Sequence, residues 1–297
     1  MSKRANEEIQ EKRAGIVTIV GRPNSGKSTL LNHIIGIKVS ITSPQPQTTR
    51  FPIKAVFNDD RGQLVFVDTP GIFARNEDTL SSTISHSSER AIQEESDIIL
   101  YLVDITRPRG LEENRILGLV RKSPSKKVLV LNKIDRPGTH YRHEYAFLQD
   151  EVEHVVEISA LKGTNVSQLV EVLFSLLPVR EPIIPLEEIQ TPLLNMDRRM
   201  YLEELIREKV FLNLRKEVPY STTVHVTKLE DKGDLLRVKA EVVTTAERYK
   251  GMIIGKGGQK IKDIGHAVKK EIEVMTNRKA NIDLTVKVDP HWVQEWI

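Results

Sequence analysis

Short apolar runs alternate with segments of helical spacing along the first 180 residues of the chain. The runs at 16–20, 97–104, 128–131 and 155–158 are almost continuously apolar, which is typical of strands buried on both faces of a parallel sheet. Apolar residues recur at helical spacing in 29–35, 112–121 and 168–177, between those strands. The pattern therefore predicts an α/β fold with a doubly wound sheet.

Two further segments complete this half. Residues 50–58 and 63–67 flank an acidic, glycine-containing turn and predict a hairpin. Residues 73–95 predict a mobile loop and then a helix ending near Ser96. We expect the serines of that helix to face solvent: Ser81, Ser82, Ser85, Ser87 and Ser88.

The pattern changes after three closely spaced prolines, Pro178, Pro182 and Pro185. A helix with one apolar stripe begins at Asp197, and alternating strands follow at 220–229 and 235–243. A glycine turn, a second amphipathic helix and a strand at 281–288 complete the order α-β-β-α-α-β. We therefore predict an extension at 1–14, an α/β domain at 15–178, a linker at 179–192 and a smaller α+β domain at 193–297.

The amino-acid composition limits the kinds of function and site that this chain can have. The 297 residues fit two domains, and their net charge of +3 means that any nucleic-acid surface is local. The absence of cysteine excludes disulfides and thiolate metal sites and is compatible with a reducing cytoplasm. No apolar run reaches membrane-span length, and residues 1–14 predict a solvated helical extension rather than a signal peptide. The composition does not decide whether the chain contacts a membrane surface.

A glycine loop joins the first strand to the first helix, in the context that a phosphate-binding P-loop requires. Its glycines let backbone N–H groups point at phosphates, Lys27 reaches the β- and γ-phosphates, and the Ser28 hydroxyl ligates Mg²⁺. The helix N-terminus adds its positive dipole end. The predicted nucleotide contacts here are Gly21, Arg22, Pro23, Asn24, Ser25, Gly26, Lys27, Ser28 and Thr29.

The second strand of the predicted hairpin runs into Asp68, Thr69, Pro70 and Gly71. Asp68 lies at a strand end where open α/β sheets bind ligands, and it would hold Mg²⁺ through water. The Gly71 N–H would meet the γ-phosphate. In the polar loop before the hairpin, we choose Thr49 over Thr48 to complete the Mg²⁺ shell, while a plain surface loop remains the alternative.

The predicted metal ligands are thus Ser28, Thr49 and Asp68, and the predicted catalytic groups are Lys27, Thr49 and Gly71. We also predict that Ile72 contacts the nucleotide. Near this position, many signalling GTPases carry a glutamine that orients the attacking water. Positioning of the attacking water must then come from backbone, an ion or a partner. We therefore expect slow intrinsic turnover, on the order of 10⁻⁴–10⁻² s⁻¹.

The motif Asn132-Lys133-Ile134-Asp135, at the end of a buried strand, indicates which nucleotide base the site binds. A carboxylate at Asp135 accepts both N1–H and N2–H of guanine, a pattern that adenine does not present. Asn132 would hold the P-loop, and the Lys133 methylenes would lie along the purine. After the last strand of the sheet, backbone N–H groups of Ser159, Ala160 and Leu161 are expected to bond guanine O6.

A basic glycine turn opens the last long helix of the smaller domain. Five cationic side chains lie within residues 248–262, with no acidic residue between them. It resembles the GXXG loop of a KH domain of the prokaryotic arrangement (type II), which clamps backbone nucleotides of single-stranded RNA. The predicted RNA contacts are Arg248, Lys250, Ile253, Ile254, Gly255, Lys256, Gly257, Gly258, Lys260, Ile261 and Lys262, with the three isoleucines lining an apolar groove. A helix-capping turn in a fold without RNA binding is the alternative.

The five nucleotide motifs resemble a translation-factor-type GTPase domain, and the KH-like half follows it. This combination resembles the Era family of ribosome-assembly GTPases. The resemblance implies GTP and GDP with Mg²⁺, binding to the 3′ end region of 16S ribosomal RNA and the 30S subunit, a cytoplasmic monomer, and peripheral association with the inner membrane face. It also associates the position of Asn24 with a phosphate-bridging K⁺, from which we hypothesise K⁺-stimulated hydrolysis.

Two other functions compete with a GTP-hydrolysing switch on ribosomal RNA. One is a constitutive RNA-binding chaperone whose nucleotide is structural. The other is a P-loop ATPase or kinase acting on RNA, which Asp135 disfavours. Arg22 or Arg50 would be the in-chain candidates for an arginine finger, and nothing specific in the sequence supports either.

Overall fold

The computed structural model describes residues 11–43, 45, 48–72, 79–93, 96–189 and 191–296. Its residues group into two compact units. The first unit comprises the described residues of Met1–Ser40, Phe51–Arg75 and Ser85–Asn195. The second comprises those of Ile41–Arg50, Asn76–Ile84 and Met196–Ile297. The domain limits drawn from the sequence stay predictions.

Several expectations fall wholly or partly outside the described residues. The first ten residues of the predicted extension do so, whereas Arg13 and Ala14 belong to the first strand. Residues 73–78 of the predicted mobile loop also lie outside, as does the side chain of Ser81.

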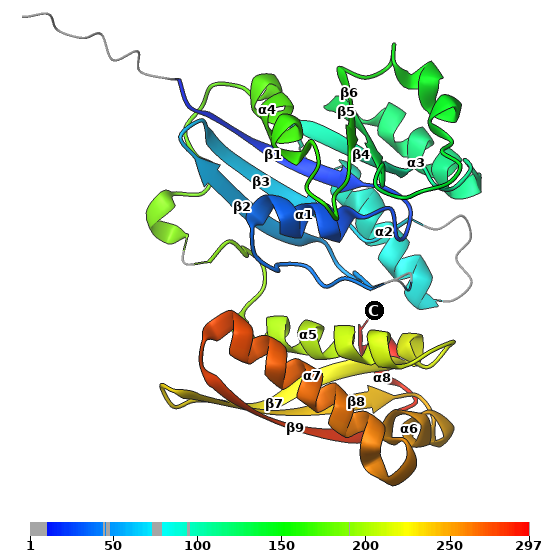
Figure 1. The fold of residues 1–297 in the computed structure, drawn as a ribbon, viewed down its shortest axis with the longest axis vertical. Helices are drawn as coiled ribbons and strands as arrows, with labels where there is room; N and C mark the ends of the chain where they lie inside the picture. Colours follow the sequence, from blue (N-terminus) through cyan, green and yellow to red (C-terminus); the bar gives the residue numbers. More distant parts are fainter. Residues whose placement is uncertain are drawn as a thin grey trace, which may run out of the picture. The chain divides into compact units, whose positions relative to one another are not determined.

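The first unit is built on a six-stranded sheet of order β2-β3-β1-β4-β5-β6 (Figure 1). Only the β2–β3 pair is antiparallel; the other pairs are parallel. The strands are β1 (Arg13–Val20), β2 (Ile53–Asp59), β3 (Gly62–Asp68), β4 (Ile98–Asp104), β5 (Lys126–Asn132) and β6 (His154–Ile158). Every residue of β3 and β4 is buried, as expected for strands covered on both faces.

Helices cover both faces of this sheet, so the predicted doubly wound α/β architecture is confirmed. The helices are α1 (Lys27–Ile35), α2 (Thr79–Gln93), of which residues 85–93 belong to this unit, α3 (Leu111–Lys122) and α4 (Val166–Leu176), with a 3₁₀ segment, η1 (Arg142–Leu148). Residues of α1 and α4 join one core cluster, and residues of α3 and η1 join another. Because parallel strands end at the same edge, the loops after β1, β3, β5 and β6 gather there.

The expectation that the serines of α2 face solvent is wrong for two of them. Ser85 and Ser88 are fully buried. The Ser88 hydroxyl donates to the Pro70 carbonyl at 2.9 Å, which satisfies its polar group inside the protein. Ser82 and Ser87 are half-buried. A serine is small enough for close packing, and the buried Ser85 hydroxyl has no hydrogen-bond partner among the described residues.

The second unit contains the predicted order α-β-β-α-α-β (Figure 1). Its elements are α5 (Arg198–Asn213), β7 (Thr222–Asp231), β8 (Leu235–Thr244), α6 (Glu247–Ile254), α7 (Gln259–Thr276), β9 (Lys279–Val288) and the short α8 (Trp292–Trp296). β8 is central, antiparallel to β7 and parallel to β9. Apolar residues of α5, α6 and α7 pack with those of the sheet in one core.

Segment 41–50, which sequence reasoning placed at the nucleotide, belongs to this second unit and contacts α5. The Thr42 N–H donates to Glu208 Oε1 at 2.8 Å, and Arg207 donates to the Thr48 carbonyl. Arg50 donates to the Thr222 carbonyl at 2.9 Å. Polar backbone thus covers α5, which is why this helix buries charged residues in addition to the predicted apolar stripe.

Trp292 lies 3% exposed beside Ile84 and Val243, and its indole N–H donates to the Ser221 carbonyl at 3.2 Å. It is a core anchor, not a free stacking surface. Across the ranges that the structure describes, no helix has the length and apolar character needed to cross a membrane.

Candidate nucleotide and nucleic-acid sites

The P-loop lies between β1 and α1 and folds around the Lys27 ammonium. Lys27 Nζ donates to the Gly21 carbonyl at 3.0 Å and to the Arg22 carbonyl at 3.1 Å. Its side chain is only 6% exposed, and this burial lowers its pKa to about 8, although the carboxylates of Asp68 and Glu113 oppose the shift. An anion bound beside this poorly hydrated cation would gain a strong electrostatic partner.

Two predicted Mg²⁺ ligands lie together at the start of α1 and the end of β3. Ser28 Oγ donates to Asp68 Oδ2 at 2.8 Å, and Ser40 Oγ donates to the same oxygen at 2.9 Å. Asp68 is fully buried, which raises its pKa, and its Oδ1 has no hydrogen-bond partner within the protein. A hydroxyl beside a buried carboxylate with an unused oxygen fits a hard cation such as Mg²⁺.

The third predicted ligand, Thr49, belongs to the second unit with segment 41–50 and is 7% exposed. Ser40, which sequence reasoning missed, also donates to Asp68 beside Ser28, and the metal contact of Thr49 stays a prediction. The signal for Ser40 was weak, because one serine in a polar segment has no distinguishing spacing.

Asn132 ties three loops together at the end of β5. Its Nδ2 donates to the Ser25 carbonyl at 2.8 Å, and its Oδ1 accepts the Ala160 N–H at 2.9 Å. The structure thus places the predicted P-loop contact of Asn132. Asn132 also occupies the Ala160 N–H, which sequence reasoning assigned to guanine O6.

Two of the three backbone N–H groups of the Ser159-Ala160-Leu161 loop are therefore engaged within the protein, and the bond from this loop to guanine O6 stays a prediction. The Ser159 N–H donates to the Thr164 carbonyl at 3.1 Å, so it too is engaged within the protein. The Ser159 hydroxyl donates to Asp135 Oδ1 at 2.6 Å and thereby orients the carboxylate proposed to read guanine. Leu161 is 62% exposed. The side chain of Ser159, not its backbone, is the contribution that the sequence did not reveal.

Lys133 joins the base motif to the P-loop. Its Nζ donates to the Asn24 carbonyl and to Asp104 Oδ2, both at 2.7 Å. Asn24 itself has a positive φ of 62°, which a non-glycine residue adopts rarely. The ammonium therefore holds an unusual turn of the P-loop while the methylene stem of Lys133 stays partly exposed.

The segment after β3 is anchored in the core. The Thr69 hydroxyl donates to the Ile19 carbonyl at 2.7 Å, and Pro70 accepts from Ser88. The side chain of Ile72 is fully buried in a core cluster, so it packs in the interior, and a contact of Ile72 with the nucleotide stays a prediction. An isoleucine there packs in the interior because it has no polar group to direct toward water.

The glycine turn of the second unit presents open backbone. Gly257 has a φ of 60°, and a side-chain carbon built there would meet no atom within 4 Å. Lys256 and Lys262 are exposed and Lys260 is half-buried. Arg248 stacks over the Tyr249 ring with 4.5 Å from Cζ to the centroid.

One of the three isoleucines predicted to line the groove is misplaced. Ile253 is fully buried and belongs to the core of the second unit. Ile254 and Ile261 are half-buried, and Ile261 lines a groove. Helix α6 directs the Ile253 side chain inward, which a mixed apolar-glycine stretch did not reveal.

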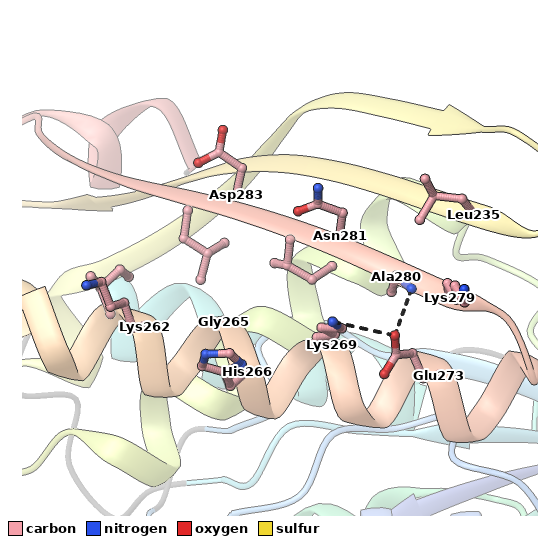
Figure 2. A pocket seen from close by; sticks show the side chains of 13 residues that line it. Leu235, Lys262, Gly265, His266, Lys269, Glu273, Lys279, Ala280, Asn281 and Asp283 are labelled. Carbon is pink, nitrogen blue, oxygen red and sulfur yellow. Dashed lines mark hydrogen bonds and ion pairs between the residues drawn. The ribbon is translucent and has the colours of Figure 1, made fainter.

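Figure 2 shows this groove, of about 660 Å³, between α7 and β9. Lys262, His266 and Lys269 line it from the helix, and Asn281 and Asp283 line it from the strand. Sequence reasoning found Lys262 but missed the other four. The spacing of 262, 266 and 269 places them on one helix face, so continuing the basic turn along α7 would have found two of them.

Both halves of the chain match known protein families. Residues 16–133 match the family model described as 50S ribosome-binding GTPase, and residues 217–293 match the KH domain model. The chain is 37% identical to the GTPase Era of Borreliella burgdorferi over 95% of its own length and 97% of that protein. The chain belongs to the Era family of GTPases.

Other Era proteins agree. The GTPase Era of Aquifex aeolicus is 36% identical over 94% of this chain and 95% of its own length. A crystal structure of an A. aeolicus Era variant bound to GDP and AlF₄⁻ matches with a TM-score of 0.87, 35% identity and coverage of 95% and 96%. A second Era structure, in complex with MgGDPNP and nucleotides 1506–1542 of 16S ribosomal RNA, matches with a TM-score of 0.86 and 34% identity over 95% of this chain and 96% of that one. The predictions of a GTPase and of a KH domain are thereby confirmed.

Proposed function

We propose that this GTPase is a molecular switch that binds the 3′ end region of 16S ribosomal RNA during assembly of the 30S subunit. One observation carries the proposal: a guanine-type nucleotide site and an open basic glycine turn occur in one chain that matches Era along 95% of its length. The Era structure with 16S ribosomal RNA supports the choice of RNA.

We propose that different residues of the first unit bind the base, the phosphates and the metal ion during GTP hydrolysis. Asp135, oriented by Ser159, accepts the guanine N–H groups, and Lys27 attracts the β- and γ-phosphates. Ser28 and Asp68 would hold Mg²⁺, which neutralises charge on the transferring phosphoryl group when it is bound. Gly71 would donate its N–H to the γ-phosphate.

The second proposed component of the reaction is a K⁺ ion at Asn24. Lys133 donates to the Asn24 carbonyl and holds this positive-φ backbone, and we propose that the Asn24 side chain ligates the ion beside the phosphates. Turnover of GTP by the purified chain should be several times faster in KCl than in NaCl of equal ionic strength. Equal rates in the two salts would remove K⁺ from the proposal and leave the GTPase intact.

For RNA, we propose that the glycine turn clamps the phosphate backbone and that the α7–β9 groove receives bases. Gly257→Asp should reduce affinity for an oligonucleotide of the 16S 3′ end about tenfold or more, because it places an anion against phosphates. GTP affinity should not change.

Gly233→Asp is the matched control. Gly233 lies in the same unit, has a φ of 68° and also has open space at its side-chain position. Retained RNA capture by the Gly257 variant would place the clamp elsewhere. Equal RNA affinity with a GTP analogue and with GDP would favour the alternative of a chaperone whose nucleotide is structural.

The resemblance to Era also supports a cytoplasmic location, a monomeric state and peripheral association with the inner membrane face, which we propose with it. Sedimentation equilibrium tests the monomer. Cosedimentation with vesicles of anionic lipid tests the membrane contact.

A further inference from the structure

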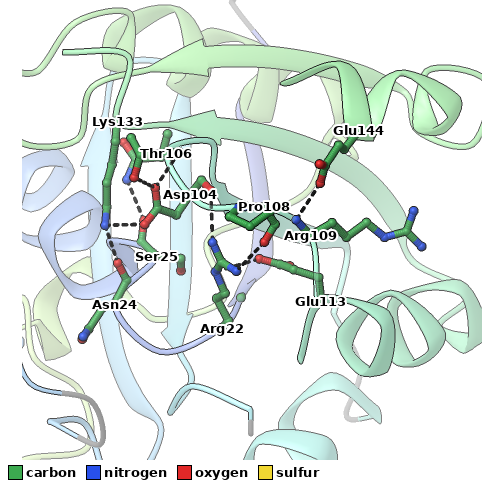
Figure 3. A network of polar contacts seen from close by, with 12 residues as sticks. Arg22, Asn24, Ser25, Asp104, Thr106, Pro108, Arg109, Glu113, Lys133 and Glu144 are labelled. Atoms are coloured by element: carbon green, nitrogen blue, oxygen red, sulfur yellow. Dashed lines mark hydrogen bonds and ion pairs between the residues drawn. The ribbon is translucent and has the colours of Figure 1, made fainter. Parts of the chain in front are cut away.

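Behind the P-loop lies a buried charged network that neither binds phosphate nor reads the base (Figure 3). Arg22 is 3% exposed, and its Nε lies 3.0 Å from Oε1 of Glu113, which is fully buried in the first turn of α3. These two atoms form an ion pair without hydrogen-bond geometry. The Tyr101 hydroxyl donates to the other Glu113 oxygen at 2.7 Å.

The same guanidinium also reaches backbone at the end of β4. Arg22 Nη2 donates to the Asp104 carbonyl at 3.3 Å, and Nη1 donates to the Pro108 carbonyl at 3.2 Å. Three fixed partners therefore hold the Arg22 side chain. A planar guanidinium with five N–H donors suits such a position, and a single ammonium does not.

The backbone that carries this side chain is where the parts of the γ-phosphate site meet. The Arg22 carbonyl accepts from Lys27 Nζ at 3.1 Å. Gly71 lies so close to Pro23 that a side-chain carbon at Gly71 would be 2.7 Å from the Pro23 Cα. Two residues on from Arg22, the Asn24 carbonyl accepts from Lys133. Any movement of residues 22–24 would shift the lysine, the glycine and the asparagine together.

We infer that Arg22 is a positioning residue for GTP hydrolysis, which acts through Glu113 to fix residues 22–24 and is not an arginine finger. This inference rests on the GTPase activity that family membership establishes. The buried pair holds the loop from behind, so the side chain needs no contact with the nucleotide. The negative charge of Glu113 also favours the ammonium form of Lys27 across the same loop.

The consequence is a specific kinetic signature. Gly71 and Asn24 are proposed to act at the γ-phosphate, which GDP lacks, whereas Lys27 also reaches the β-phosphate, which GDP retains. Loosening residues 22–24 should therefore slow hydrolysis more than it weakens GDP binding. A misplacement of about 1 Å at catalytic groups costs about 100-fold in rate, which sets the scale.

The test compares Arg22→Met, Glu113→Gln and the double variant in the full-length chain. Single-turnover GTP hydrolysis, the Kd of a fluorescent GDP and the melting temperature are measured for each. We expect each single variant to hydrolyse GTP about 10- to 100-fold more slowly, with the Kd for GDP changed less than about threefold. The double variant should be no slower than Arg22→Met, because both substitutions remove one contact.

Two further variants complete the design. Arg22→Lys keeps the charge but not the three-way contact, and it should recover only a small part of the rate. Arg121→Met removes an exposed arginine–glutamate ion pair, with Glu151, from the same helix and should leave the rate unchanged.

A rate within about twofold of the parent in Arg22→Met would overturn the inference. So would a double variant whose loss equals the product of the two single losses, since the residues would then act independently. A parallel loss of GDP affinity, hydrolysis and melting temperature would also overturn it, because the pair would then serve general stability alone. If Arg22→Met does not fold, the double variant, which leaves no uncompensated buried charge, still decides the outcome.

Discussion

Replacing Asp135 by asparagine tests the proposed base specificity in the most direct way. Asp135 follows β5, and its side chain is 13% exposed. Its Oδ1 accepts the Ser159 hydroxyl at 2.6 Å, while Oδ2 lies 4.0 Å from Arg136 Nε. One short hydrogen bond therefore fixes the carboxylate plane and leaves lone pairs on both oxygens for the guanine N1–H and N2–H donors.

The size of the effect follows from those two donors. Hydrogen bonds to a charged group contribute about 1.5–3 kcal/mol each, so losing two of them costs about 3–6 kcal/mol. That energy corresponds to a loss of GTP affinity of about 10²–10⁴-fold. The asparagine amide also presents a donor where guanine presents donors. Xanthine carries a carbonyl oxygen at position 2, so the same substitution should increase affinity for XTP.

Calorimetric titration with GTP and XTP measures both changes. Asp60→Asn, an exposed acid in the turn between β2 and β3, is the matched control and should bind GTP normally. Ser159→Ala keeps the Asp135 carboxylate but removes the hydrogen bond that fixes its orientation. We expect this variant to lose GTP affinity about tenfold. GTP affinity within about threefold of the parent in Asp135→Asn, or no gain for XTP, would refute the assignment of Asp135 to the base.

Two other predictions concern the buried charges. The pKa of Lys27 is about 8 in the free protein, and bound phosphate raises it, so binding takes up a proton and affinity for GDP should fall as pH rises above about 8. Fluorescent GDP titrations from about pH 7 to about pH 9 check this, and a flat profile would contradict it. Arg207→Met should lower the unfolding free energy by about 3–5 kcal/mol, because it leaves Glu204 and the Thr48 carbonyl without their buried partner. Urea unfolding measures this loss, and an unchanged midpoint would contradict it.

Local pattern was enough to predict the two folds. Buried parallel strands need continuous apolar runs, and their carboxyl ends collect at one edge, so motifs that follow those strands are predicted to meet. The P-loop lysine, the Ser28–Asp68 pair and the contact of Asn132 with the P-loop agree with this reasoning. Each depends on residues whose distance in space follows from strand order.

Side-chain direction was harder to predict. Ile253 and Ile72 occupy the core although they adjoin the glycine turn and the Asp68–Gly71 motif. Ser88 is buried because a carbonyl from a distant loop is available to it. In each case the deciding neighbour comes from another part of the chain, and periodicity carries no information about it.

The sequence by itself determined the order of strands and helices, the guanine motif and the basic glycine turn, because those depend on periodicity and on residue types at short range. Only the tertiary structure decided that Arg22 faces Glu113, that Ser159 orients Asp135, and that segment 41–50 belongs to the second unit. Those outcomes depend on which distant surface offers a hydrogen bond or a counter-charge once water is excluded, and that surface exists only after the chain has folded.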